Sequence, residues 1–107
     1  MNNEDFSKIV ADRVDKINKV LGAKGKEYSS ATDRLHNFKL AATIQCCTPE
    51  QALYGMMCKH LVSVHDIVFS GAPVSKEIIN EKIGDTINYH ILLEALILER
   101  INENRKN

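Results

Sequence analysis

Apolar residues recur at steps of three and four along the first part of the chain. Between residues 4 and 21 they are Phe6, Ile9, Val10, Val14, Ile17, Val20 and Leu21. This spacing places them on one stripe of a helix, whereas Asp12, Lys16 and Lys19 fall outside it. The pattern predicts an amphipathic helix over residues 4–21.

The remaining pattern predicts three more helices and no strand. A cap at Thr32 or Asp33 predicts a short helix over residues 32–44. The run Thr48-Pro49-Glu50-Gln51 combines a capping hydroxyl, a proline at the first helical position and a glutamine three residues after the cap. These features are typical of a helix start and predict a helix over residues 49–69.

Ser75 caps the last predicted helix, over residues 75–105, in which Gly84 marks a place where the helix could be irregular. Between residues 91 and 98 only Glu94 is polar, and a helix that is apolar all round is expected to be buried on all sides. In so short a chain this suggests a subunit interface. We therefore expect a single all-α domain over residues 1–107, like a four-helix bundle, that forms a homo-oligomer through helix 75–105.

Composition narrows the classes of partner. The chain has 14 Lys plus Arg and 14 Asp plus Glu, so its formal net charge is zero. It therefore has no strong net electrostatic field that would attract nucleic acid in general. The 44% hydrophobic share excludes a disordered chain, and no segment approaches the roughly 20 apolar residues of a membrane span. The three cysteines have no CxxC spacing, which argues against a disulfide framework or a cysteine zinc site. We expect a soluble, cytoplasmic protein without a membrane partner.

The last helix carries a polar stripe of Glu81, Asp85 and Asn88 at steps of four and three. One interpretation is a Mg²⁺ site, because this ion takes one or two carboxylates, keeps several waters and bridges to substrate phosphates. The other is a solvated face, since two carboxylates four residues apart repel each other by only a few tenths of a kcal/mol when exposed.

A second polar stripe lies on the preceding helix, at Lys59, Ser63 and Asp66. If the two long helices are antiparallel, as their short connection favours, the two stripes could face each other across a groove. Lys59 would then meet a phosphate and Asp66 would join the metal-binding carboxylates. The alternative is a salt bridge from Lys59 to Glu81 or Asp85.

The histidines offer two further interpretations. His60 lies on the apolar stripe of its helix, which favours a hydrogen-bonded core histidine over a ligand. His36, His65-Asp66 and Asp85 reproduce the order of ligands in metal-dependent phosphohydrolases of the HD type. That pattern is degenerate, and the short spacing from Asp66 to Asp85 leaves little room for the helices such a fold inserts.

Several motifs together resemble a known family. The order "KxYSSA-DRLHNFKLAA", then a helix with "MMCKH", then an acidic residue four before "D-x-x-N-Y", is similar to that of small helical bacteriophage proteins. These are called nucleotide modification associated proteins, and are thought to be distantly similar to MazG-type all-α nucleoside triphosphate pyrophosphohydrolases. The resemblance covers about residues 24–95, and its most specific parts are the Tyr28 to Phe38 segment and the Asp85 to Tyr89 helix.

The resemblance implies an oligomeric helical bundle that handles a nucleotide through Mg²⁺. Carried over by position, Glu81 and Asp85 hold the metal, and Lys59 lies near the phosphates. Tyr28, Arg34 and Asn37 lie at the nucleotide, and Asn88 and Tyr89 line the same groove. With Asp66 added from the second polar stripe, the expected metal ligands are Glu81, Asp85 and Asp66, and these together with Lys59 are the expected catalytic residues.

The segment before the second helix has the side chains that nucleotide binding requires. It combines cations, hydroxyls, one ring and an amide, in Lys24, Lys26, Tyr28, Ser29, Ser30, Arg34 and Asn37. Such groups grip a phosphate and a base edge. The alternative is a plain helix connector in which Tyr28 packs on the bundle.

These observations favour a Mg²⁺-dependent (deoxy)nucleoside triphosphate pyrophosphohydrolase, acting in the host cytoplasm if the protein is phage-encoded. The Glu-x-x-Glu pair of MazG-type enzymes is missing from the helix before Glu81, and Lys82 stands where their spacing has a carboxylate. An alternative is therefore a non-catalytic nucleotide-binding sponge or protein-interaction adaptor, with a role in counter-defence. A third hypothesis is a structural oligomer organised by residues 91–98.

Overall fold

The computed structural model describes residues 1–22 and 33–106. In these ranges the chain forms four helices and no strand: α1 (Asn3–Leu21), α2 (His36–Gln45), α3 (Pro49–Ser70) and α4 (Lys76–Lys106). The all-α class predicted from hydrophobic spacing is confirmed. No helix in the described part of the chain is both long enough and apolar enough to cross a membrane.

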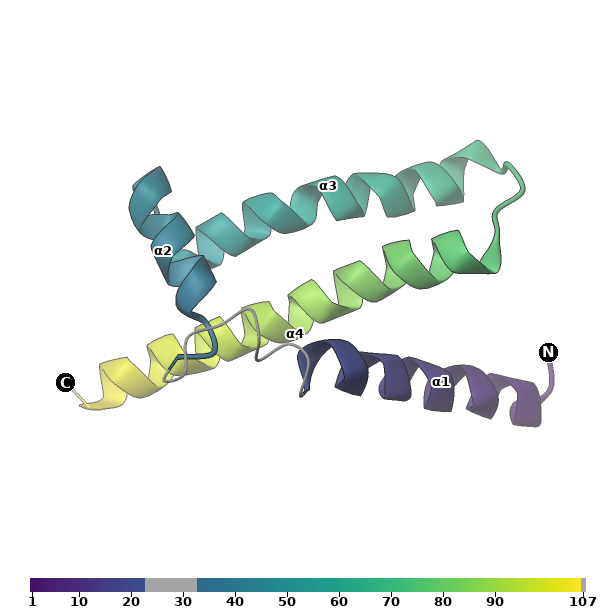
Figure 1. Cartoon of the computed structure of the whole chain (residues 1–107), viewed down its shortest axis with the longest axis horizontal. Helices are drawn as coiled ribbons and strands as arrows, with labels where there is room; N and C mark the ends of the chain where they lie inside the picture. The colour runs from purple at the N-terminus through teal and green to yellow at the C-terminus, as the bar shows by residue number, and fades with distance from the viewer. Residues whose placement is uncertain (23–32, 107) are drawn as a thin grey trace.

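The helices are arranged around α4 (Figure 1). Helix α3 runs antiparallel to α4, as the short connection at residues 71–75 led us to expect, and α2 crosses the start of α3. Helix α1 lies along the first half of α4, on the other side of α4 from α3 in this view. The molecule is elongated, at 50 × 28 × 26 Å. Its radius of gyration of 16.3 Å exceeds the ~13 Å of a compact domain of this length.

Capping explains where α3 begins and ends. The Gln51 amide donates to Thr48 Oγ1 at 3.1 Å, and the Thr48 amide donates to Gln51 Oε1 at 3.0 Å. This reciprocal pair is the predicted capping box. Helix α3 ends at Gly71, whose φ of 64° lies in the left-handed region that glycine adopts without strain.

The other helix boundaries differ slightly from the predictions. Helix α4 follows Ser75, whose hydroxyl accepts from the Ile78 amide at 3.2 Å, and it passes through Gly84 without interruption. Helix α2 begins at His36, because Asp33 accepts from the Leu35 amide at 2.9 Å within a turn that precedes the helix. The predicted start at Thr32 lies outside the described residues.

A small core holds α2, α3 and α4 together. Three leucines are buried at its centre: Leu35, which directly precedes α2, Leu53 near the start of α3 and Leu96 in the second half of α4. Met57, one turn further along α3, is also buried. No residue of α1 is buried. The apolar packing is therefore concentrated at one end of the elongated molecule.

The all-round apolar segment at residues 91–98 is mostly covered within the chain itself. Leu96 is buried, and Leu92, Leu93 and Ala95 pack against the core. Ile91 and Leu98 stay exposed. Much of the apolar surface of this segment thus packs within the described fold. A subunit interface through α4 stays a prediction.

Ion pairs attach α2 to the end of α4. Lys39 Nζ lies 2.6 Å from Asp33 Oδ2 and 2.5 Å from Glu99 Oε1. The hydrogen bond from Lys39, followed by that from the Leu35 amide, lowers the pKa of Asp33 below its ordinary value. The hydrogen bonds to Asp33 and Glu99 raise the pKa of Lys39.

The lowered pKa of Asp33 predicts a specific dependence of stability on acid. A carboxyl group whose folded pKa is depressed stabilises the fold above its unfolded pKa of about 3.9, and this contribution is lost as the pH falls through the folded pKa. Asp33→Asn should therefore lower the free energy of unfolding at pH 7, and the difference from wild type should shrink on acidification below pH about 4. Urea unfolding followed by circular dichroism at neutral and acidic pH measures this.

The same chemical change at an exposed carboxylate, Asp66→Asn, is the control and should leave both unfolding curves close to wild type. An Asp33→Asn defect of equal size at both pH values would contradict the role given to the Lys39 pair.

Candidate functional site

The predicted polar stripe of α4 lies in a groove between α4 and α1. The groove has a volume of about 370 Å³. Its lining residues come from both helices: Arg13, Lys16, Lys19, Val20, Asn80, Glu81, Gly84, Asp85 and Asn88. Glu81, Asp85 and Asn88 thus share one face, as their spacing predicted. The helix across this groove is α1, whereas the sequence favoured α3.

Gly84 allows Arg13 to lie against α4. It is buried, and a Cβ built on it would lie 2.6 Å from Arg13 Nη1. The missing side chain therefore leaves room for the guanidinium directly on the backbone of α4. The glycine that marked a potential irregularity in the helix is instead a point of close approach.

The cations of the groove differ in how they are paired. Lys16 Nζ lies 2.6 Å from Asp12 Oδ2, and Lys19 Nζ lies 2.9 Å from Asp15 Oδ2, both within α1. The hydrogen bond from Lys16 lowers the pKa of Asp12, and the one to Asp15 raises the pKa of Lys19. Arg13 makes no ion pair within residues 1–22 and 33–106. Of the three groove cations, only its charge is uncommitted in the described part of the chain.

Two amide oxygens in the groove also lack partners. Asn80 Oδ1 and Asn88 Oδ1 are buried and accept no hydrogen bond from the described residues. A buried acceptor without a donor costs about 1–3 kcal/mol. A ligand that brought N–H or O–H groups within reach of these oxygens would recover this energy, and it would have to displace the side chains that cover them.

The two carboxylates of the groove have neighbouring cations or rings. His60 Nδ1 lies 3.3 Å from Asp85 Oδ2, and the His60 ring stacks at a tilt on Tyr89, with centroids 5.0 Å apart. Lys82 Nζ lies 3.6 Å from Glu81 Oε1. The sequence placed Lys59 opposite these carboxylates, but Lys59 is exposed and His60, its neighbour, faces Asp85.

The expected three-carboxylate metal site does not assemble. Asp66 is 73% exposed and its ion-pair partner is His65, at 3.7 Å. It lies six residues after His60, which faces α4, and this separation rotates it by about 120° around α3. No three His, Cys, Asp or Glu side chains within the described ranges are placed to hold one metal ion. This holds equally for the HD-type set of His36, His65, Asp66 and Asp85.

The predicted nucleotide-binding residues are spread over several places. Asn88 lines the groove, but Tyr89 packs against the core and His60. Arg34 Nη2 donates to the Leu21 carbonyl and so joins the end of α1 to the start of α2, and Asn37 is exposed. Lys24, Lys26, Tyr28 and Ser29 lie outside the described residues.

The sequence interpretation missed the contribution of α1. Lys16 and Lys19 were only placed outside the apolar stripe of the first helix, and neither Arg13 nor Asn80 was considered. A signal was present: Arg13, Ile17 and Val20 fall at steps of four and three, so one cation lies on the same face as apolar residues.

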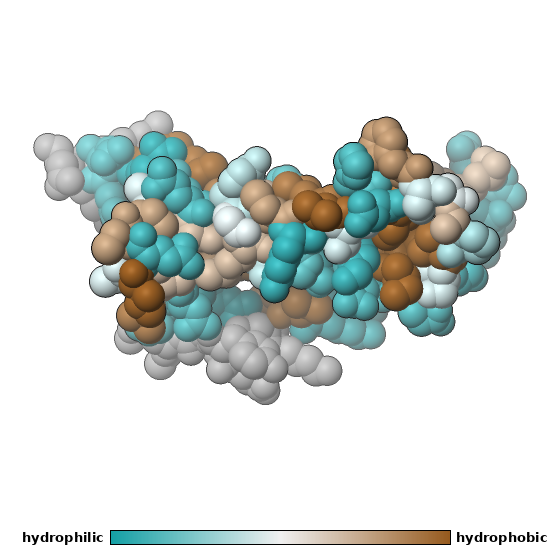
Figure 2. All heavy atoms as spheres, turned by 90° about the horizontal axis from the view of Figure 1, so that it is seen from above, coloured by the Kyte–Doolittle hydropathy of each residue, from teal (hydrophilic) through white to brown (hydrophobic). Residues whose placement is uncertain are grey.

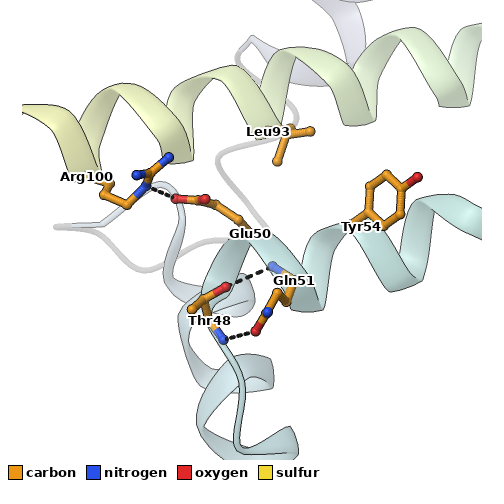
Figure 3. A pocket seen from close by; sticks show the side chains of 6 residues that line it. All are labelled: Thr48, Glu50, Gln51, Tyr54, Leu93 and Arg100. Atoms are coloured by element: carbon orange, nitrogen blue, oxygen red, sulfur yellow. Dashed lines mark hydrogen bonds and ion pairs between the residues drawn. The ribbon is translucent and has the colours of Figure 1, made fainter.

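A second, larger cavity of about 580 Å³ lies between the start of α3 and the second half of α4 (Figure 3). Glu50 and Arg100 point toward each other across it, with Arg100 Nε donating to Glu50 Oε1 at 2.7 Å. Thr48 and Gln51 are occupied by the capping box. Because these polar groups satisfy one another, the smaller groove with its uncommitted groups is the stronger candidate site.

Comparison with known proteins identifies no relative. No protein-family model matches the chain, and no curated protein or solved structure matches it. The site is therefore interpreted from its own geometry.

The contact between Gly84 and Arg13 can be measured with glycine substitutions. A Cβ added at Gly55 on α3 would have no other atom within 4 Å. Gly55→Ala should therefore raise the free energy of unfolding by the full difference in helix propensity, about 1 kcal/mol. Gly84→Ala should gain less, because the new methyl group displaces the guanidinium. In an Arg13→Ala background, Gly84→Ala should raise the free energy of unfolding by as much as Gly55→Ala does. Urea unfolding of the single and double variants gives the three values.

An equal gain from Gly84→Ala with and without Arg13 would show that the guanidinium does not rest on α4.

Proposed function

We propose that this protein binds a nucleotide in the groove between α1 and α4. The observation that carries the proposal is one uncommitted guanidinium, Arg13, beside two buried amide oxygens that lack donors, Asn80 and Asn88. The motif resemblance to nucleotide-handling phage proteins supports the same ligand class.

Each group has a partner on a nucleotide. A guanidinium presents paired N–H donors that match phosphate oxygens, and this pairing is stronger than a neutral hydrogen bond. The asparagine oxygens accept hydrogen bonds from N–H groups of a base or hydroxyls of a sugar. A groove of about 370 Å³ falls in the range of small-molecule sites, roughly 300–1,000 Å³.

Binding is better supported than hydrolysis. Splitting a triphosphate requires charge neutralisation on both sides of the displaced phosphorus. The carboxylates that would hold metal are engaged with His60 and Lys82, and Asp66 lies elsewhere on α3. The non-catalytic branch of the sequence interpretation, a protein that sequesters a nucleotide, is the function we favour.

Titration calorimetry with nucleoside mono-, di- and triphosphates tests the proposal. At least one nucleotide should bind, and Arg13→Gln should weaken it about 10- to 100-fold, the equivalent of a charge-assisted hydrogen bond of about 1.5–3 kcal/mol. Lys8→Gln is the matched control, because Lys8 lies on α1 outside the groove and is paired with Glu4. Equal affinities for the two variants, or no binding by any nucleotide, would reject this site.

Mg²⁺-dependent pyrophosphohydrolysis is the second candidate, favoured by the presence of Glu81 and Asp85 in the same groove. Incubation of each nucleotide with protein and Mg²⁺ or Mn²⁺ separates the two functions. We expect the nucleotide to be recovered unchanged. Pyrophosphate release that Asp85→Asn abolishes would establish the hydrolase instead.

A further inference from the structure

The apolar stripe of α1 is largely open to solvent. Phe6, Ile9, Val10 and Val14 are 59%, 51%, 48% and 51% exposed, and no residue of the helix is buried. An amphipathic helix in a folded protein normally buries such a stripe, and monomers rarely expose apolar patches above a few hundred Å². We call these four residues the α1 stripe.

The described residues leave about half of each side chain of the stripe uncovered. The residues of α1 that line the groove with α4 belong to its second half, from Arg13 to Val20. Helices of this length are marginal in water unless tertiary packing covers the apolar face. The first half of α1 therefore needs a second surface to be stable.

More apolar surface lies at the same end of the molecule. The hairpin of α3 and α4 turns there (Figure 1), and its last and first turns expose Val68, Phe69, Ile78 and Ile79. In Figure 2, which views the molecule from the α3 side, brown, apolar side chains lie toward this end, interspersed with teal, polar ones. A stable protein interface covers about 800 Å² on each partner, so a contact through the α1 stripe would have to include further exposed side chains such as these.

The charges of the chain favour a second copy as the occupant. The formal net charge is zero, so two copies do not repel each other over long range. Helix α1 has Glu4 and Asp5 in its first turn and Lys19 in its last turn, with Lys16 one turn earlier. Lys16 and Lys19 also pair with acidic residues of their own helix. Residues 3–11 nevertheless have two acidic and one basic side chain, for a net charge of −1, and residues 12–21 have two acidic and three basic side chains, for a net charge of +1. Two antiparallel α1 helices would therefore place the negative half of each beside the positive half of the other, and would also oppose their helix dipoles.

We propose that two copies of this chain pair through the α1 stripe with their α1 helices antiparallel. The contact is isologous, so that each stripe covers the other about a twofold axis. This inference does not depend on nucleotide binding. It also places the subunit interface on α1 and the hairpin end, whereas the apolar run at residues 91–98 had suggested α4.

Sedimentation equilibrium over a range of concentrations tests the pairing. The wild type should have about twice the chain mass of 12.0 kDa. Val10→Glu keeps a good helix former but puts a charge in the stripe, and should give a monomer. The control is Val62→Glu, an equally exposed valine on α3 outside the stripe, which should remain a dimer. A wild-type monomer at all concentrations, or dissociation by the Val62 variant alone, would overturn the proposal.

Charge exchange tests the antiparallel arrangement and does not depend on how Val10→Glu folds. A first variant carries Glu4→Lys and Asp5→Lys, and a second carries Lys16→Glu and Lys19→Glu. Each should self-associate more weakly than the wild type, because like charges now meet at both ends of the contact. An equimolar mixture should recover the dimer. If each variant alone dimerises as well as the wild type, the antiparallel pairing is wrong.

Discussion

The contact of α3 with α4 around Leu53 is the interaction on which the rest of this structure depends. Leu53 has no exposed surface, and it brings together Leu35, which directly precedes α2, and Leu96 from α4. Because few other side chains are fully buried, this is where the apolar packing of the described fold is most complete. It sets the antiparallel register in which His60 meets Asp85.

A core at one end of two long helices leaves the other end uncovered. Helix α4 extends well beyond the core in the direction of its N-terminus, and α1 packs against that extension without burying any residue of its own. The elongated shape and the exposed stripe of α1 have the same cause, which is a shortage of partner surface among residues 1–22 and 33–106. The proposed self-association would supply that surface from a second copy, and a small domain gains most from such a contact.

The groove joins these two features of the fold. One wall is α4, which the core holds, and the other is α1, whose cations reach the groove from a helix with little apolar anchoring. Arg13 fits against α4 only because residue 84 has no side chain. A dimer that covers the stripe would hold α1 in place, and with it the guanidinium proposed to bind phosphate.

Local features of this protein were determined by the sequence alone. The capping box at Thr48, the turn at Gly71, the four helices and the common face of Glu81, Asp85 and Asn88 all follow from short-range geometry, which depends on residues within a few positions of each other. Only the tertiary structure decided which helix faces that stripe. The packing around Leu53 rotates α3 so that His60 meets Asp85 and Asp66 points elsewhere, and the gap at Gly84 brings Arg13 of α1 into the groove. Helical periodicity tells which residues share a face, but the choice of the opposing face depends on contacts between residues far apart in the chain.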